Sequence, residues 1–156
     1  MTIKSLWQMF FLWGNYRSIG PESRKFLDIT MQCIGKDLSP REGLFGCAET
    51  VNTLAVKTWG EPVGGDLSTA KMLKALVESP RFVQVVYPFP GDIIISPTGH
   101  GNGKISNGHV GVVVENSFIA SNNSINSLLE INYTIKAWRE RYGVVGGFPV
   151  LFFRRI

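Results

Sequence analysis

The sequence changes character at Pro80, and this change constrains the fold more than any other feature. Before Pro80, apolar residues recur at three- and four-residue spacing, which indicates helices that bury one face. After Pro80, short apolar runs are separated by turn residues, which indicates strands. The order predicts an α+β fold in which N-terminal helices pack on a central antiparallel sheet. The chain has 156 residues, of which 44% are hydrophobic, so it can form one domain with a substantial core.

The helices expected before Pro80 have recognisable ends. Pro21 lies near the start of the first helix and Gly35 at its end. The next helix carries a buried stripe and ends at the Gly-Pro-rich segment that follows Trp59. The three expected helices span about residues 18–35, 47–59 and 67–78.

The N-terminus adds a short amphipathic segment over residues 2–16. Its apolar run ends near Trp13, far short of the ~18–20 residues that span a bilayer. No small-x-small cleavage site follows it, which argues against a signal peptide. We therefore expect a helical extension over residues 1–20, followed by a single domain over residues 21–156, with no stable membrane span.

Four stretches after Pro80 predict strands: "RFVQVVY", "PFPGDIIIS", "HVGVVVENSFIASNN" and "PVLFFRRI". The third reads as two strands joined by a tight turn at Glu115-Asn116. Residues 125–142 are ambiguous, with a helical turn expected around residues 137–141.

Charge and metal-ligand content exclude several functions. The formal net charge of +4 suits many anionic partners, but the chain carries neither a dense Lys/Arg stripe nor an RRM-like aromatic motif, so we expect no nucleic acid. Two cysteines and two histidines without a CxxC pair argue against a disulfide framework and a structural zinc site. We expect neither a metal nor a cofactor.

Cys47 lies in "GLFGCAETVN", at the expected start of a helix. Unpaired backbone N–H groups and the helix dipole at that position lower a thiol pKa and favour the nucleophilic thiolate. Gly46 allows a close approach and leaves room for a substrate backbone. A free cysteine is nevertheless more often a small buried hydrophobe, and a disulfide with Cys33 would block attack.

A cysteine nucleophile needs a base. His100 lies in a Gly- and Asn-rich loop, where solvent exposure is the commoner outcome. His109 opens an apolar strand, on a face that Gly111 keeps open, and can project into a cleft over the helix that carries Cys47.

An imidazole base also needs an orienting partner. A two-residue turn at Glu115-Asn116 places Asn122 opposite His109, and a one-residue change in that loop presents Asn123 instead. Either asparagine could equally serve turn chemistry at a strand end.

Two acidic residues have simpler interpretations. Asp92 follows Pro-Gly before a strand, where a turn with an Asx hydrogen bond is commoner than catalysis. Glu49 lies in the first turn of the expected helix, where a carboxylate is favourable on electrostatic grounds alone.

The order of these parts resembles the NlpC-like and CHAP-type papain-like cysteine peptidases and amidases. The resemblance rests on the helix-start cysteine, "PGDIIIS" and "GHVGVVVENSFIASNN", and covers about residues 24–124. It implies a papain-like fold in which Cys47 is the nucleophile, His109 the base and Asn122 the polar third member. The neighbours Gly46 and Ala48 depart from the usual pattern, as does Ala120, where a third histidine is often found.

The same resemblance implies hydrolysis of an amide bond in bacterial peptidoglycan, with the wall or its muropeptides as substrate. Small size and the lack of a clear signal peptide fit a monomeric phage or prophage lysis enzyme, or an effector injected into a rival. Such a protein is made in the cytoplasm, acts in the periplasm or cell wall and is compatible with an immunity or holin-type partner. The alternatives are a catalytically inactive papain-like wall-binding or phage structural module, and a cysteine peptidase that acts on proteins.

Overall fold

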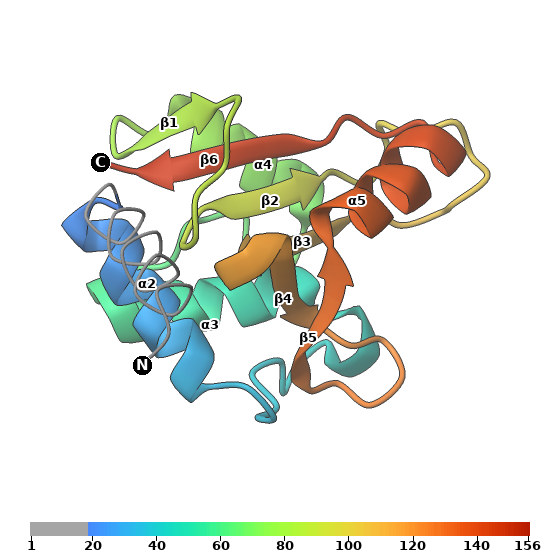
Figure 1. The fold of residues 1–156 in the computed structure, drawn as a ribbon. Coiled ribbons are helices and arrows are strands. Elements are labelled where there is room, and N and C mark those ends of the chain that lie inside the picture. The colour runs from blue at the N-terminus through green and yellow to red at the C-terminus, as the bar shows by residue number, and fades with distance from the viewer. Residues whose placement is uncertain (1–18) are drawn as a thin grey trace, which may run out of the picture.

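The structure, a computed structural model, describes residues 19–156 (Figure 1). Of the extension predicted over residues 1–20, residues 1–18 therefore lie outside the described residues. Among the described residues, three helices precede the strands along the chain, as expected, and a further helical segment lies between the last two strands. The helices are α2 (Pro21–Gln32), α3 (Cys47–Trp59), α4 (Thr69–Glu78) and α5 (Ile135–Trp138). The strands are β1 (Phe82–Val85), β2 (Ile93–Ser96), β3 (His109–Val113), β4 (Phe118–Asn122), β5 (Leu129–Thr134) and β6 (Leu151–Arg155).

The helix ends follow the punctuation in the sequence. Pro21 occupies the first turn of α2. Gly60 ends α3 with a left-handed φ of 78°, and the bounds predicted for this helix are confirmed. At the start of α4, the side chain of Ser68 accepts a hydrogen bond of 3.3 Å from the backbone N–H of Lys71.

The six strands form one sheet in the order β1-β6-β2-β3-β4-β5, and all neighbouring pairs are antiparallel. Strand β6, the last in the chain, lies between β1 and β2 (Figure 1). Strand β5 falls in the stretch that the sequence left ambiguous. The helical turn expected after it is confirmed, and it continues from α5 into a π-helix over Arg139–Val145. The predicted α+β class is confirmed.

The β3–β4 hairpin has a register one residue away from the predicted one. The expected two-residue turn pairs Val110 with Ser121, whereas in the structure Gly111 pairs with Ser121. The cause is a three-residue turn, Glu115–Ser117, whose last two residues have φ values of 58° and 62°. One extra loop residue moves every β4 side chain to the opposite face of the sheet from the one expected.

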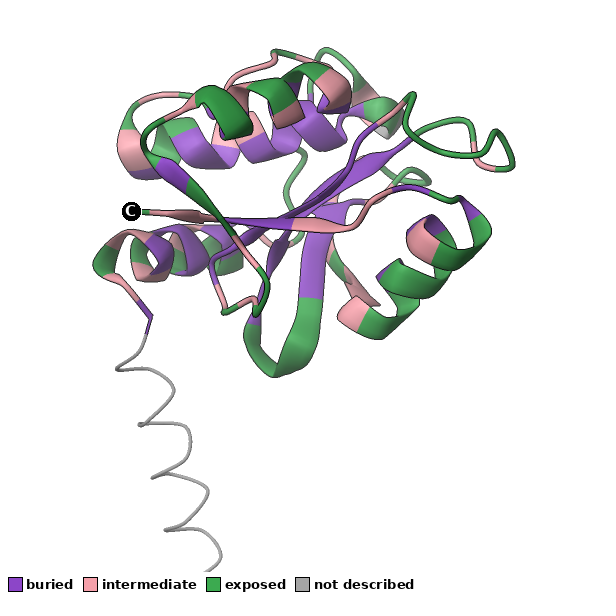
Figure 2. Ribbon diagram, turned by 90° about the horizontal axis from the view of Figure 1, so that it is seen from above, coloured by how far each residue is buried: buried purple, intermediate pink, exposed green. Residues whose placement is uncertain are grey.

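The sheet separates two apolar clusters. Helices α2, α3 and α4 contribute to the larger cluster, which packs on alternate strand residues such as Ile93, Ile95 and Val112. Trp138 and Tyr142 belong to the smaller cluster on the other face. In Figure 2 the strands run through the middle of the molecule as its most continuously buried part. Within residues 19–156, every helix is too short or too polar to cross a membrane.

Candidate active site

A pocket of about 940 Å³ lies where the start of α3 meets the start of β3 and the π-helix 139–145. Cys47, His109 and Asn122, the three residues that the sequence selected, all line it. The structure therefore brings the sequence-predicted residues to one pocket, but it gives Asn122 surroundings different from those expected.

Cys47 is the first residue of α3 and is 8% exposed. Cys33 and Cys47 both carry free thiols, so Cys47 is not held in the disulfide considered from the sequence. The thiol lies against the start of β3, because the backbone of Val110 hydrogen-bonds to it. That contact brings the sulfur to the residue next to His109.

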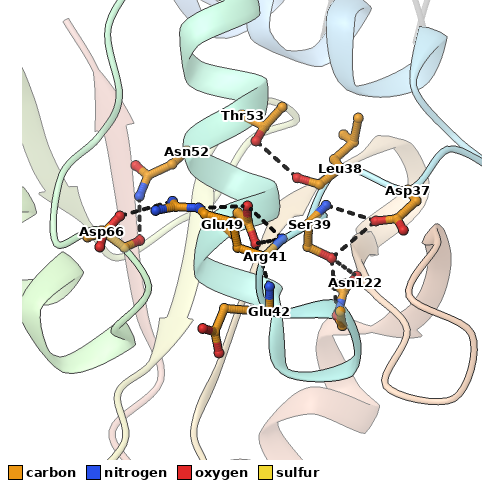
Figure 3. Close-up of polar contacts among 11 residues, drawn as sticks. Asp37, Leu38, Ser39, Arg41, Glu42, Glu49, Asn52, Thr53, Asp66 and Asn122 are labelled. Carbon is orange, nitrogen blue, oxygen red and sulfur yellow. Dashed lines mark hydrogen bonds and ion pairs between the residues drawn. The ribbon is translucent and has the colours of Figure 1, made fainter.

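A buried carboxylate holds the segment that leads into α3. Glu49, 5% exposed, accepts hydrogen bonds from the backbone N–H groups of Arg41 at 3.2 Å and Glu42 at 2.9 Å (Figure 3). The guanidinium of Arg41 donates to the same carboxylate at 3.1 Å and to Asp66 at 3.0 Å. The sequence predicted a favourable helix-end charge at Glu49, and the structure adds that this charge fixes the backbone of the preceding loop.

Two further residues of α3 extend this attachment. Thr53 donates to the carbonyl of Leu38 at 3.0 Å (Figure 3). Asn52 bonds on the other side of the helix, where its amide donates to the carbonyls of Gly64 at 3.1 Å and Asp66 at 2.8 Å. Helix α3 therefore fixes both the loop before it and the loop after it.

Asn122 belongs to this loop support. Its side-chain amide donates to the carbonyl of Gly43 at 3.1 Å, and its oxygen accepts from the hydroxyl of Ser39 at 3.2 Å (Figure 3). Ser39 packs so tightly that a Cβ at Gly46 would overlap its side chain. The space beside Gly46, which the sequence analysis assigned to a substrate, is filled by Ser39.

The partner of His109 is Ser121, the residue before Asn122. His109 Nε2 and the hydroxyl of Ser121 are 3.0 Å apart. The observed register places Ser121 across from Gly111, on the face that His109 shares, and turns Asn122 to the other face. A Cβ at Gly111 would meet β4 atoms within 3.0 Å, so the face expected to be open is closed by β4.

The hydrogen bonds around Ser121 favour one tautomer of His109. Ser121 donates its hydroxyl proton to the side-chain oxygen of Asn132 at 2.6 Å, because that oxygen can only accept. The hydroxyl oxygen then accepts from His109 Nε2–H, which leaves Nδ1 with a free lone pair. The amide group of Asn132 donates to the Ser121 carbonyl at 3.5 Å, which favours this orientation of the amide.

Aromatic rings enclose the imidazole of His109. The ring stacks on Trp138 with centroids 5.1 Å apart and on Tyr142 at 5.7 Å, and it meets the edge of Tyr133 at 6.1 Å. Trp138 is itself fixed, since its Nε1 donates to the hydroxyl of Ser96 at 3.0 Å. Packing therefore limits rotation of the histidine ring.

Burial leaves both Cys47 and His109 neutral near pH 7. Burial raises the pKa of the Cys47 thiol to about 11, which outweighs the hydrogen bonds from the backbone of Val110, Ala48 and Cys47 itself. The lowered thiol pKa expected from the helix N-terminus is therefore wrong. Burial, followed by the positive charge of Arg141, lowers the pKa of His109 to about 4.

The remaining candidates have structural surroundings. Asp92 is fully buried and accepts a hydrogen bond from the backbone N–H of Phe89 at 2.7 Å. Its two carboxylate oxygens also accept from Nε and Nη2 of Arg154 at 2.9 and 2.7 Å. Its interpretation as a turn residue is confirmed. His100 is exposed in its loop, as expected. Within residues 19–156, no group of three or more His, Cys, Asp or Glu side chains is placed to hold a metal ion.

Sequence reasoning missed the partners of His109. Ser121 was missed because the expected strand register placed it on the other face of the sheet. Asn132 and the three aromatic residues lie in the stretch 125–142, which the sequence left ambiguous. A usable signal was the four-residue spacing of Trp138 and Tyr142, which places two aromatic rings on one helical face.

Comparison with known proteins supports the fold and does not assign a family. No family model matches the sequence, and no curated protein matches it. A solved chain with a similar fold comes from the crystal structure of the type VI native effector–immunity complex Tae3–Tai3 of Ralstonia pickettii. The superposition has a TM-score of 0.54 at 17% sequence identity and covers 86% of this chain and 98% of that one. Membership of the NlpC-like or CHAP-type families therefore remains a resemblance.

Proposed function

We propose that this protein hydrolyses an amide bond of bacterial peptidoglycan, with Cys47 as nucleophile and His109 as base. The observation that carries the proposal is the shared pocket: a cysteine at a helix start and a histidine whose hydrogen bonds favour one tautomer border the same cavity. The proposed steps are acyl transfer to the sulfur, followed by hydrolysis of the thioester.

The neutral state of both groups defines the first step. Because the Cys47 pKa lies well above that of His109, the resting pair is thiol and imidazole, not an ion pair. His109 Nδ1 accepts the thiol proton as the sulfur attacks the carbonyl carbon, and returns it to the leaving amine. The backbone N–H of Cys47, in the first turn of α3, is a donor for the developing oxyanion.

Asn122 serves this reaction as a loop support, and Ser121 with Asn132 takes the role that the sequence analysis gave to Asn122. A hydrogen bond at Nε2 holds the imidazole in one orientation and stabilises the imidazolium that forms. Ser121 and Asn132 are therefore positioning residues.

The substrate is proposed from the sequence resemblance, and the setting from the comparison with the effector–immunity complex. A similar fold in a type VI effector–immunity complex supports the proposal of an effector that acts in the periplasm or cell wall. An immunity partner would then cover the pocket around Cys47. A phage lysis enzyme is the alternative setting for the same chemistry.

A second candidate function has an observation in its favour. Cys47 is more than nine-tenths buried, and its raised thiol pKa is typical of an unreactive cysteine. A wall-binding module that retains the fold without catalysis would show both features.

Incubation of purified protein with peptidoglycan separates these functions. Wild type is expected to release muropeptides, Cys47→Ala to release none, and Cys33→Ala, which removes the other buried thiol, to match wild type. Mass spectrometry of the products identifies the bond. Equal inertness of wild type and Cys47→Ala would reject the enzyme in favour of the binding module, and cleavage of denatured proteins but not of muropeptides would identify a protein peptidase.

Cells provide a test of the setting. Expression with an added periplasmic export signal is expected to lyse bacteria, whereas cytoplasmic expression and exported Cys47→Ala are not. Lysis by both exported forms would show that toxicity does not depend on the thiol.

A further inference from the structure

The pocket has an uneven distribution of charge. Among the described residues that line it, the charged side chains are those of Glu42 and Arg141. Glu42 comes from the loop before α3, and Arg141 comes from the π-helix on the His109 side. The rest of the lining is neutral, with Ser, Thr and Asn side chains among apolar ones.

Arg141 lies beside Tyr142 in that wall. Its guanidinium carbon lies 5.6 Å from the centroid of the Tyr142 ring, and Tyr142 stacks on His109. Its backbone carbonyl accepts from Gly146 N–H at 3.0 Å. A π-helical turn at this point presents a cation and the ring that packs on the base from consecutive residues.

The charge of Arg141 is close enough to His109 to act on it. Burial is the main cause of the lowered pKa of His109, and the positive charge of Arg141 lowers it further by opposing protonation of the imidazole. A cation beside a catalytic base hinders proton transfer from the thiol unless an anion offsets it. The structure therefore has a position where a negative group on the substrate would help both binding and reaction.

We propose that Arg141 binds a free carboxylate of the peptide substrate, so that the enzyme prefers stem peptides with ionised carboxylates over peptides in which these groups are amidated. The guanidinium fork matches a carboxylate with two parallel N–H···O bonds. The inference rests on the proposed function, because it names the substrate chemistry of the same pocket.

The offsetting charge gives a specific kinetic signature. A bound carboxylate neutralises Arg141 and lets His109 accept the thiol proton more readily. Removing Arg141 should therefore slow cleavage of the acidic peptide, but leave unchanged or accelerate cleavage of the amidated one. A residue with a merely structural role would slow both.

Binding is measured first, in a Cys47→Ala background, so that the answer does not depend on turnover. The probes are a cell-wall stem tetrapeptide with its free carboxylates and the same peptide with those groups converted to primary amides. We expect the acidic peptide to bind about 10- to 100-fold more tightly, as for hydrogen bonds between charged groups. Adding Arg141→Gln should reduce the ratio to about threefold or less, and Arg141→Lys should retain part of it.

Lys136→Gln is the matched control, since it removes one positive charge from the exposed surface of the neighbouring α5 and Lys136 does not line the pocket. It should leave the ratio unchanged. Equal binding of both peptides, or binding of neither, would overturn the inference even if wild type cleaves peptidoglycan. Acid-selective binding without cleavage by wild type would reject the proposed hydrolysis and leave the carboxylate site standing.

Discussion

The two sides of the pocket are built by different means. Cys47 begins a helix whose preceding loop is held by hydrogen bonds between side chains and the backbone, among them those that the buried carboxylate of Glu49 accepts. His109 is positioned by aromatic packing and a short chain of side-chain hydrogen bonds through Ser121. The difference teaches that the start of α3 is fixed largely by its own helix and loop, whereas the imidazole of His109 depends on contacts made across the sheet.

The largest expected effect comes from removing His109, the proposed base. His109→Gln keeps a polar side chain in the aromatic enclosure but cannot accept the thiol proton. We expect kcat/KM on muropeptides to fall at least about 10³-fold, in the range typical of general bases. Alkylation of Cys47 after denaturation confirms that the thiol is intact. Activity within tenfold of wild type would show that another group is the base.

The second prediction uses pH to isolate the His109 side. In the folded protein His109 has a pKa of about 4, below the ordinary 6.5, so the unfolded chain binds the proton more readily. The stability that this neutral histidine contributes is therefore full above about pH 6.5 and is lost as pH falls toward 4. The loss amounts to about 3 kcal/mol. Urea denaturation from pH 4 to 7 should show a shallower acid limb for His109→Gln than for wild type, whereas parallel limbs would contradict the buried neutral histidine.

The third prediction tests the Cys47 side of the pocket alone. Glu49→Gln leaves a buried amide group facing backbone N–H donors, so the free energy of unfolding should fall by about 2–3 kcal/mol. Chemical denaturation measures this. Arg41→Gln is the matched control: Arg41 is largely exposed, so this change should cost about 1 kcal/mol or less.

Glu49→Gln should also leave the environment of His109 unchanged, which the NMR chemical shifts of its ring report. If Glu49→Gln changed those shifts as much as a substitution of Ser121, which contacts His109, the Cys47 and His109 sides of the pocket would not be independent.

The fourth prediction loosens the histidine without removing it. Ser121→Ala deletes the acceptor for Nε2–H and should lower kcat about 10- to 100-fold, with a larger Nδ1–H population in ¹⁵N spectra of His109. Asn132→Leu should have a similar effect. The loss of activation free energy in the Ser121→Ala/Asn132→Leu double variant should not exceed the sum of the two single losses. Unchanged kcat in Ser121→Ala would remove Ser121 from the mechanism.

The smallest effect is expected at the exposed end of the Glu49 attachment. Asp66→Asn removes an ion pair whose partners are both largely exposed, Arg41 and Asp66. The free energy of unfolding should change by about 0.5 kcal/mol or less. A loss above about 1.5 kcal/mol would show that the attachment depends on the whole charge network and not on Glu49.

The sequence allowed the helices and the position of Cys47 to be predicted, because caps and periodicity are local. The three-residue turn before β4 was not predictable from turn preferences alone, since it places Ser117, a residue not typical of left-handed backbone, at a φ of 62°. That turn decides whether Ser121 or Asn122 faces His109. The raised pKa of Cys47 could not be foreseen either, because it arises from burial by distant residues.

The way Glu49 binds its loop has a consequence for how this protein can change. Its carboxylate bonds to main-chain amides at positions 41 and 42, and every residue except proline carries such an amide. These hydrogen bonds therefore do not need the side chain at position 42, and that side chain lines the pocket. Substitutions at position 42 can therefore change ligand preference without destabilising the fold. A mutational library should tolerate many residues at position 42 but exclude proline, and it should retain Glu49.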